Sequence, residues 1–238
     1  EETTHHNPAN VAMTAEKSGD GYKLTGEKRF VIDGHIADTL IVVARTGGAA
    51  GETQGLSMFL VDAKAKGVTV TRTHMVDSRN AAMVALDGVE VSADAALGSI
   101  GGAFAELENV LDLGRASLAA EMLGGAEAVF DTTLEYLKER KQFGVIIGTF
   151  QALKHRAAEM FCEVEICRSV VLEALSALEE RRNDVPRVTS LAKARLGEAA
   201  RLITNEGVQM HGGIGMMDDV DMGLFETRPG ASANAGGQ

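Results

Sequence analysis

The distribution of proline constrains this sequence more than any other feature. The chain has three prolines, and none of them lies between Pro8 and Pro186. Proline breaks helix interiors because it lacks an amide hydrogen and clashes with the preceding turn, so this stretch can hold long helices. From residue 103 onward, apolar side chains recur at helical spacing and predict helices over about 103–140, 149–182 and 186–210. Long amphipathic helices joined by short connections predict an antiparallel bundle.

The segment that precedes the helices has a different pattern. Between residues 22 and 92, short β-branched or apolar runs are separated by Gly, Asp and Asn, which is typical of a small antiparallel sandwich or barrel. The runs cover residues 22–25, 40–45, 57–61, 68–73, 83–86 and 89–92. The predicted fold class is therefore α+β, with a small antiparallel β-sandwich or barrel domain at 1–100 and a helix-bundle domain at 101–225. The low-complexity segment 226–238 is predicted to be disordered.

Composition and charge exclude several classes of protein. The net charge of −11 argues against nonspecific nucleic-acid binding, which requires basic patches. No run of about 18 apolar residues occurs, so no membrane span is predicted. Cys162 and Cys167 lie five residues apart on one predicted helix, a poor geometry for a disulfide, and we interpret them as buried thiols in a reducing compartment. The predicted location is the cytoplasm, and no metal site is predicted.

One segment, residues 136–151, combines charge, amide groups and aromatic rings at a helix junction. It reads YLKERKQFGVIIGTFQ and places Arg140, Gln142 and Phe143 in or beside a short loop. Guanidinium and amide donors are the groups that a phosphate or pyrophosphate ligand requires. The alternative interpretation is a helix hairpin packed by Phe143 and Phe150. This segment alone leaves both interpretations open.

A second segment, QMHGGIG at residues 209–215, follows the last predicted helix. It is not a dinucleotide-binding fingerprint, because its glycines follow a helix instead of opening one after a strand. Paired glycines after a helix are ordinary helix ends. Gly212 and Gly213 also lack side chains, however, which lets backbone amides approach a flat ring or a phosphate closely. The motif is therefore weak by itself.

Together these segments resemble a known family. Four segments of the helical part resemble the C-terminal helical domain of the acyl-CoA dehydrogenase family: 136–151, 209–215, LDLGR at 111–115 and FQALKHRAAEM at 150–160. Three earlier segments resemble its middle β-domain: GDGYKLTGEKRFVIDGHIADTLIVVART at 19–46, GLSMFLVDAKAKGVTV at 55–70 and LDGVEVSADAALG at 86–98. The resemblance extends over about residues 12–225, which is nearly the whole chain.

The resemblance implies an activity and its partners. Members of the family are flavoproteins that oxidise acyl-CoA thioesters in fatty acid metabolism. It therefore implies FAD as cofactor, acyl-CoA as substrate, an electron-transfer flavoprotein or similar acceptor, and a homo- or hetero-oligomer, with a homotetramer as the expected form. In the family a helical domain precedes the β-domain. This chain begins at Glu1 without it, so we expect a fragment that is inactive as an isolated chain.

The resemblance also implies cofactor-binding residues in the helical part. Arg140 and Gln151 match residues that hold the FAD diphosphate and adenosine, commonly those of a neighbouring subunit's cofactor. Gln142 and Phe143 line the same loop. Five residues match the segment under the adenine end of FAD: Gln209, Met210, His211, Gly212 and Gly213.

On the flavin side, Phe30 matches an aromatic residue of the β-domain and can stack on a ring. The family usually has Thr or Ser two positions later, whereas this chain has Ile32, which offers no hydroxyl donor. The substrate side is represented by Arg115, which matches an arginine near the acyl-CoA pocket. An equally weighted alternative for Arg115 is a buried ion pair with Asp112 or Glu121.

The catalytic base is not assigned. Dehydrogenation requires a base for the α proton, and the family places a carboxylate either on the first long helix or downstream of the paired glycines. The helix position is Gly114 here. Four downstream acidic residues are weak candidates: Asp218, Asp219, Asp221 and Glu226.

Three functions remain open at this point. The first is an FAD-dependent acyl-CoA dehydrogenase. The second is a non-catalytic FAD-binding partner subunit of a heteromeric acyl-CoA dehydrogenase, in which another chain supplies the base. The third is a helical assembly module without a cofactor.

Overall fold

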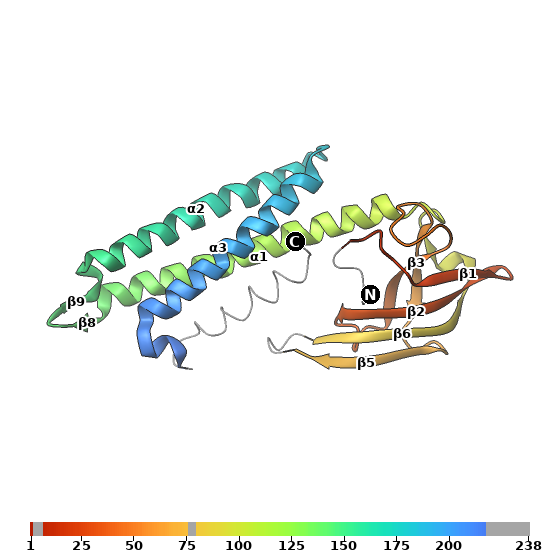
Figure 1. Cartoon of the computed structure of the whole chain (residues 1–238), viewed down its shortest axis with the longest axis horizontal. Helices are drawn as coiled ribbons and strands as arrows, with labels where there is room; N and C mark the ends of the chain where they lie inside the picture. Colours follow the sequence, from red (N-terminus) through yellow and green to blue (C-terminus); the bar gives the residue numbers. More distant parts are fainter. Residues whose placement is uncertain (2–6, 76–79, 218–238) are drawn as a thin grey trace. The chain divides into compact units, whose positions relative to one another are not determined.

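The computed structural model describes residue 1 and residues 7–75 and 80–217 (Figure 1). The described residues form two compact units, and the division lies between Asn109 and Val110. The first unit is built from strands and the second from helices, which confirms the predicted α+β class and the order of its parts.

Seven strands of the first unit form one sheet. They are β1 (Thr14–Ser18), β2 (Gly21–Ile32), β3 (Thr39–Arg45), β4 (Leu56–Asp62), β5 (Val68–His74), β6 (Asn80–Val91) and β7 (Ala96–Leu97), with a 3₁₀ turn η1 (Ala93–Ala95). Their order in the sheet is β5-β6-β2-β1-β3-β4-β7. The neighbours pair antiparallel except β1 and β3, which run parallel. Among the described residues the sheet is therefore mixed and ends at β5 and β7, so it does not close into a barrel.

Two strands differ from the sequence expectation. β1 was not predicted, because its sequence TAEKS buries only Ala15 and lacks an apolar alternation. β6 is one strand where two were predicted, because Asp87 and Gly88 suggest a turn. They form a β-bulge instead: Leu24 pairs with Val89 and Gly26 with Leu86, and Gly88 takes a φ of 59°.

A buried cation ties the loops of this unit together. Arg45, at the end of β3, is 8% exposed. Its Nε donates to Val11 O, its Nη1 to Gly47 O and Gln54 O, and its Nη2 to Ala9 O and Glu52 O, at 2.8 to 3.3 Å. The five N–H donors of the guanidinium are thus matched by five backbone carbonyl oxygens.

The second unit contains three long helices, as predicted. α1 (Phe104–Glu139) begins in the last residues of the first unit, and α2 (Gln151–Glu179) and α3 (Val185–His211) follow. The helices run alternately in opposite directions (Figure 1) and share one apolar core, in which Val129, Met160 and Leu196 are fully buried. A short hairpin of β8 (Lys141–Gln142) and β9 (Val145–Ile146) and a 3₁₀ turn η2 (Ile147–Thr149) join α1 to α2, and η3 (Gly212–Met216) follows α3.

The two cysteines only partly match expectation. Both are free, but Cys162 is exposed and only Cys167 is buried. The expectation of two buried thiols was wrong for Cys162, because this position of α2 faces away from the core. Burial raises the pKa of the Cys167 thiol to about 11. Within the described residues, none of the helices combines the length and the hydropathy that crossing a bilayer demands.

Candidate functional site

The loop after α1 presents a free cation. The backbone N–H of Arg140 donates to Tyr136 O at 2.9 Å, and its carbonyl accepts from Ile147 N–H at 2.9 Å. The backbone of Arg140 is therefore bonded both to α1 and to the segment that follows the hairpin. The side chain is exposed. Among the described residues the guanidinium has no ion-pair or hydrogen-bond partner. It is therefore available to an external anion.

Phe143 is held outward by the geometry of the hairpin. Gln142 pairs with Val145, which leaves a two-residue turn of Phe143 and Gly144 with φ values of 55° and 79°. Positive φ at both positions is typical of the turns that suit tight hairpins, although it is unusual for a bulky residue such as phenylalanine. Phe143 is 91% exposed and contacts Phe150 edge-on, with ring centroids 6.2 Å apart. The sequence predicted a short loop here, whereas the structure has a two-stranded hairpin. The Phe143-Gly144 pair is the sequence feature that could have indicated its turn.

The start of α2 adds backbone donors beside this loop. Its N-cap residue is Phe150, and the apolar side chain of phenylalanine cannot accept a hydrogen bond from the first turn. In the described residues, the amides of residues 151–153 have no acceptor, and the first amide to find one is that of Lys154, which donates to Phe150 O. A helix start of this kind attracts anions through its free N–H groups and its dipole. Gln151 lies at this start and is exposed.

The end of α3 is fastened to the end of α1. The rings of Tyr136 and His211 stack with centroids 4.3 Å apart, and Tyr136 Oη donates to His211 O at 3.3 Å. His211 is buried, and its Nδ1 donates to Gly207 O at 2.8 Å. Because a carbonyl only accepts, Nδ1 carries a hydrogen. His211 and Met210 are buried, whereas Gln209, Gly212 and Gly213 are exposed.

These contacts bring most of the predicted cofactor residues to one end of the second unit. Arg140, Gln142, Phe143 and Gln151 lie around the hairpin, and the Tyr136–His211 contact places the segment 209–213 at the same end. This end of the unit suits a dinucleotide such as FAD, whose diphosphate is anionic and whose rings are flat. It offers a guanidinium and helix amides to the diphosphate, and two exposed amide side chains and an exposed aromatic ring to the rest of the ligand.

Arg115 lies far from this group along α1. It is 25 positions before Arg140, which corresponds to about 37 Å along a helix. Its Nη1 donates to Asp112 Oδ1 at 2.6 Å, and the side chain of Asp112 is 2% exposed while that of Arg115 is 20% exposed. The ion-pair alternative with Asp112 is therefore observed. The pair leaves Arg115 partly accessible, which is compatible with a second role.

The first unit holds the predicted flavin-side residue. Lys28 pairs with Val84 and Val31 with Ala82, so one extra residue of β2 forms a bulge that includes Phe30. Phe30 has a φ of 53° and is 67% exposed, and Ile32 is 64% exposed. Bulges often redirect a side chain at a site, and this one presents an aromatic ring to the surface.

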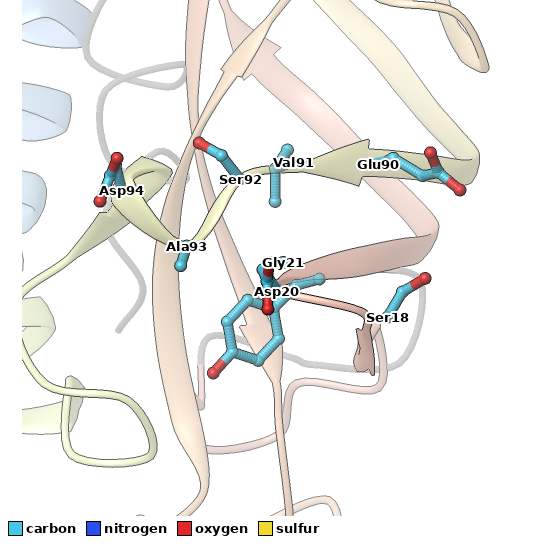
Figure 2. Close-up of a pocket in the computed structure, with 9 residues that line it drawn as sticks. Ser18, Asp20, Gly21, Glu90, Val91, Ser92, Ala93 and Asp94 are labelled. Carbon is cyan, nitrogen blue, oxygen red and sulfur yellow. The ribbon is translucent and has the colours of Figure 1, made fainter.

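Two hollows contain none of the predicted residues. One of about 550 Å³ lies at the β1–β2 turn and the end of β6, where Asp20, Glu90 and Asp94 contribute carboxylates (Figure 2). Another of about 460 Å³ lies between α2 and α3 and is lined by charged residues such as Arg195 and Glu163. The described residues hold no group of three or more His, Cys, Asp or Glu suited to a metal ion. The candidate base positions Asp218, Asp219, Asp221 and Glu226 lie outside the described residues.

Comparisons with known proteins point to one family. The chain is 32% identical over 212 residues to the caffeyl-CoA reductase-Etf complex subunit CarC of Acetobacterium woodii, covering 88% of this chain and 55% of that protein. It is 34% identical over 204 residues to the mitochondrial short/branched chain specific acyl-CoA dehydrogenase of Bos taurus, covering 84% of this chain and 47% of that protein. The chain thus spans about half the length of the curated relatives it matches.

A solved structure and two family models also match acyl-CoA dehydrogenases. The solved structure of butyryl-CoA dehydrogenase from Megasphaera elsdenii has a TM-score of 0.93 at 27% identity, covering 100% of this chain and 63% of that one. A model described as "Acyl-CoA dehydrogenase, middle domain" matches residues 1–89, and one described as "Acyl-CoA dehydrogenase, C-terminal domain" matches residues 102–228. The two matches follow the two units in order, and this chain belongs to the acyl-CoA dehydrogenase family.

Proposed function

We propose that this chain contributes to an FAD-dependent acyl-CoA dehydrogenase that oxidises an acyl-CoA thioester between its α and β carbons. The observation that carries the proposal is the group at the end of the helical unit, where the loop that begins at Arg140, whose guanidinium has no partner among the described residues, leads into the unsatisfied amides at the start of α2. The relatives are acyl-CoA dehydrogenases and related reductases, which supports an oxidoreductase. FAD, when bound, supplies an acceptor for the hydride that leaves the β carbon.

Each predicted residue has a role in this proposal. Arg140 and Gln151 would hold the diphosphate, with Gln142 and Phe143 beside them. The exposed backbone of Gly212 and Gly213, with Gln209, would lie under the adenine, and the buried Met210 and His211 would support that segment from below. Phe30 would face the flavin ring. Arg115 would face the acyl-CoA, where a guanidinium can donate to the thioester carbonyl or to a phosphate.

A second candidate has a specific observation in its favour. Gly114 occupies the helix position where the family can place its base, so α1 supplies no carboxylate there. This favours a partner subunit that binds FAD while another chain removes the α proton. The cofactor-free helical module has no comparable support, because the chain belongs to a flavoprotein family.

The diphosphate contact is tested by substitution of Arg140. Arg140→Ala should weaken FAD retention by about tenfold or more, because a charge-assisted contact of roughly 1.5 to 3 kcal/mol is lost. The measurement is flavin content after gel filtration, together with a dissociation constant from fluorescence. Lys138→Ala is the matched control, since Lys138 is an exposed cation on the last turn of α1. Equal retention of FAD by the two variants would contradict the assignment.

The assembly should be an oligomer, and we propose a tetramer built as a dimer of dimers. The separation of about 37 Å between Arg115 and Arg140 along α1 favours two different sites, with the acyl-CoA at Arg115 and the FAD of a neighbouring copy at Arg140. Large apolar side chains are also exposed on this unit, including Phe143 of the hairpin at 91% and Leu172 of α2 at 61%. Light scattering of the FAD-loaded protein should show four subunits. A flavin-loaded monomer would rule out a cofactor shared between copies.

The electron acceptor and location follow as further parts of the proposal. We propose an electron-transfer flavoprotein or a similar carrier as the acceptor, and the name of the Acetobacterium woodii relative refers to an Etf complex. We also propose fatty acid metabolism as the process and the cytoplasm as the location.

A further inference from the structure

A buried polar cluster links α1 to α3 around Arg115. Asp112 is 1% exposed. Its Oδ1 accepts from Arg115 Nη1 at 2.6 Å and lies 3.1 Å from Thr189 Oγ1. Thr189 is fully buried on the first turns of α3. Two groups that can donate therefore converge on one carboxylate oxygen inside the unit.

The Thr189 hydroxyl has more acceptors than hydrogens. Its Oγ1 lies 3.1 Å from Asp112 Oδ1, 2.9 Å from Val185 O and 3.4 Å from Pro186 O. A hydroxyl has one hydrogen to donate, and neither a carboxylate nor a carbonyl can donate in return. The regular helix pattern already provides Val185 O with the amide hydrogen of residue 189. The hydroxyl can therefore rotate so that its hydrogen bonds to Asp112 instead of Val185 O, and Val185 O still has a donor.

Arg115 has donors to spare on its accessible side. Its guanidinium carries five N–H groups, and within the described part of the chain the one hydrogen bond it makes is that of Nη1 to Asp112. Its side chain is 20% exposed, whereas that of Asp112 is 2% exposed. The buried carboxylate thus holds Nη1 of the guanidinium, while Nε and Nη2 have no partner among the described residues.

We propose that Asp112 and Thr189 are positioning residues for Arg115, and that the Thr189 hydroxyl turns from Val185 O to Asp112 when Arg115 donates to an oxygen of acyl-CoA. The inference rests on the proposed function, which places Arg115 at the acyl-CoA. When the guanidinium also donates to the ligand, its interaction with Asp112 becomes weaker. A buried carboxylate whose charge is not fully compensated is costly in free energy. The hydroxyl hydrogen provides that compensation, so Thr189 strengthens ligand binding without touching the ligand.

A second buried cation lies on the same helix as Thr189. Lys193 lies one helical turn after Thr189 and is 4% exposed. Burial and, after it, the charge of Arg115 lower the pKa of the Lys193 ammonium group.

The test measures the affinity of the FAD-loaded protein for acetyl-CoA, which has no β carbon and cannot be dehydrogenated. Thr189→Val should weaken binding by about tenfold, the effect of losing one hydrogen bond to a charged group, and Thr189→Ser should restore it to within about twofold. Thr204→Val is the matched control, because Thr204 is a buried threonine of α3 whose hydroxyl meets, within 7–75 and 80–217, only Ala200 O and Arg201 O. It should leave the affinity unchanged.

A double-mutant cycle separates positioning from general stability. Arg115→Ala should weaken acetyl-CoA binding, and Thr189→Val should have an effect of less than about twofold in that background, because residues that act through one another are non-additive. Asp112→Asn is a second variant with the same expected pattern if Thr189→Val folds poorly. Additive losses, or full affinity in both Thr189→Val and Asp112→Asn, would overturn the inference while leaving the proposed function intact. Full affinity of Arg115→Ala would instead refute the acyl-CoA contact on which both depend.

Discussion

Gly114→Glu is expected to raise the rate of flavin reduction by an acyl-CoA thioester about 10²- to 10⁴-fold, the usual contribution of a general base. Gly114 is exposed on α1, and a Cβ built at this position meets nothing within 4 Å. A carboxylate can therefore be added without steric conflict. The helix should gain about 0.5 to 1 kcal/mol as well, because glycine is unfavourable in a helix interior. The measurement is anaerobic flavin bleaching on addition of a panel of acyl-CoA thioesters.

Two further variants isolate the role of the carboxylate. Gly114→Gln has nearly the same shape but cannot accept a proton at neutral pH, so it should bleach no faster than the parent. Gly124→Glu places the same carboxylate ten residues further along α1, at another glycine whose Cβ would meet open space. Acceleration by Gly124→Glu as well would indicate a general charge effect. Rapid bleaching by the unmodified protein would show that a base already exists elsewhere.

Arg45→Ala is expected to lower the free energy of unfolding by about 3 to 5 kcal/mol, because each buried carbonyl oxygen left without a donor costs about 1 to 3 kcal/mol and those nearer the surface recover part of this from water. Removal of the guanidinium takes one donor from each of five backbone carbonyl oxygens, in loops that the side chain joins to β3. Of these, Ala9 O keeps the amides of Val11 and Gly51 as donors. Arg45→Lys should recover only part of this loss, because an ammonium group has three donors and no planar fork. Urea denaturation followed by circular dichroism measures the change.

The matched control for Arg45 is an exposed arginine of the same sheet. Arg72 on β5 donates to the side chain of Asn80 and to no backbone carbonyl among the described residues. Arg72→Ala should change the free energy of unfolding by less than about 0.5 kcal/mol. A similar loss in both variants would mean that the effect at Arg45 reflects net charge and not the carbonyl cluster.

The helices could be predicted closely because their signals are local. The absence of proline and the helical spacing predicted 103–140, and the structure has α1 at Phe104–Glu139. The strands were harder, because a strand is defined by its partner. β1 has a polar sequence and exists through its pairing with β2, and the bulge at Gly88 shows itself only in the register with β2. Neither pairing is encoded within a window of neighbouring residues.

The site shows the same division between local and long-range information. Arg140, Gln142 and Phe143 lie within one short segment, so their proximity could be predicted from the sequence. Thr189 could not be predicted, because it meets Asp112 across 77 positions of the chain. Its hydroxyl contacts the carbonyl four residues earlier, as that of Thr204 on the same helix does, so this helical pattern does not distinguish the two residues.

The 36 residues of α1 also act as a spacer of defined length and phase. A helix advances about 1.5 Å and turns about 100° per residue, so the 25 steps from Arg115 to Arg140 return to nearly the same side of the cylinder. One inserted residue between them would change the distance little but would swing one arginine about 100° away from the direction of the other. Substitutions on the exposed side of α1 should therefore be tolerated far better than insertions or deletions. The effect of an insertion or deletion would depend on whether it adds or removes a whole helical turn.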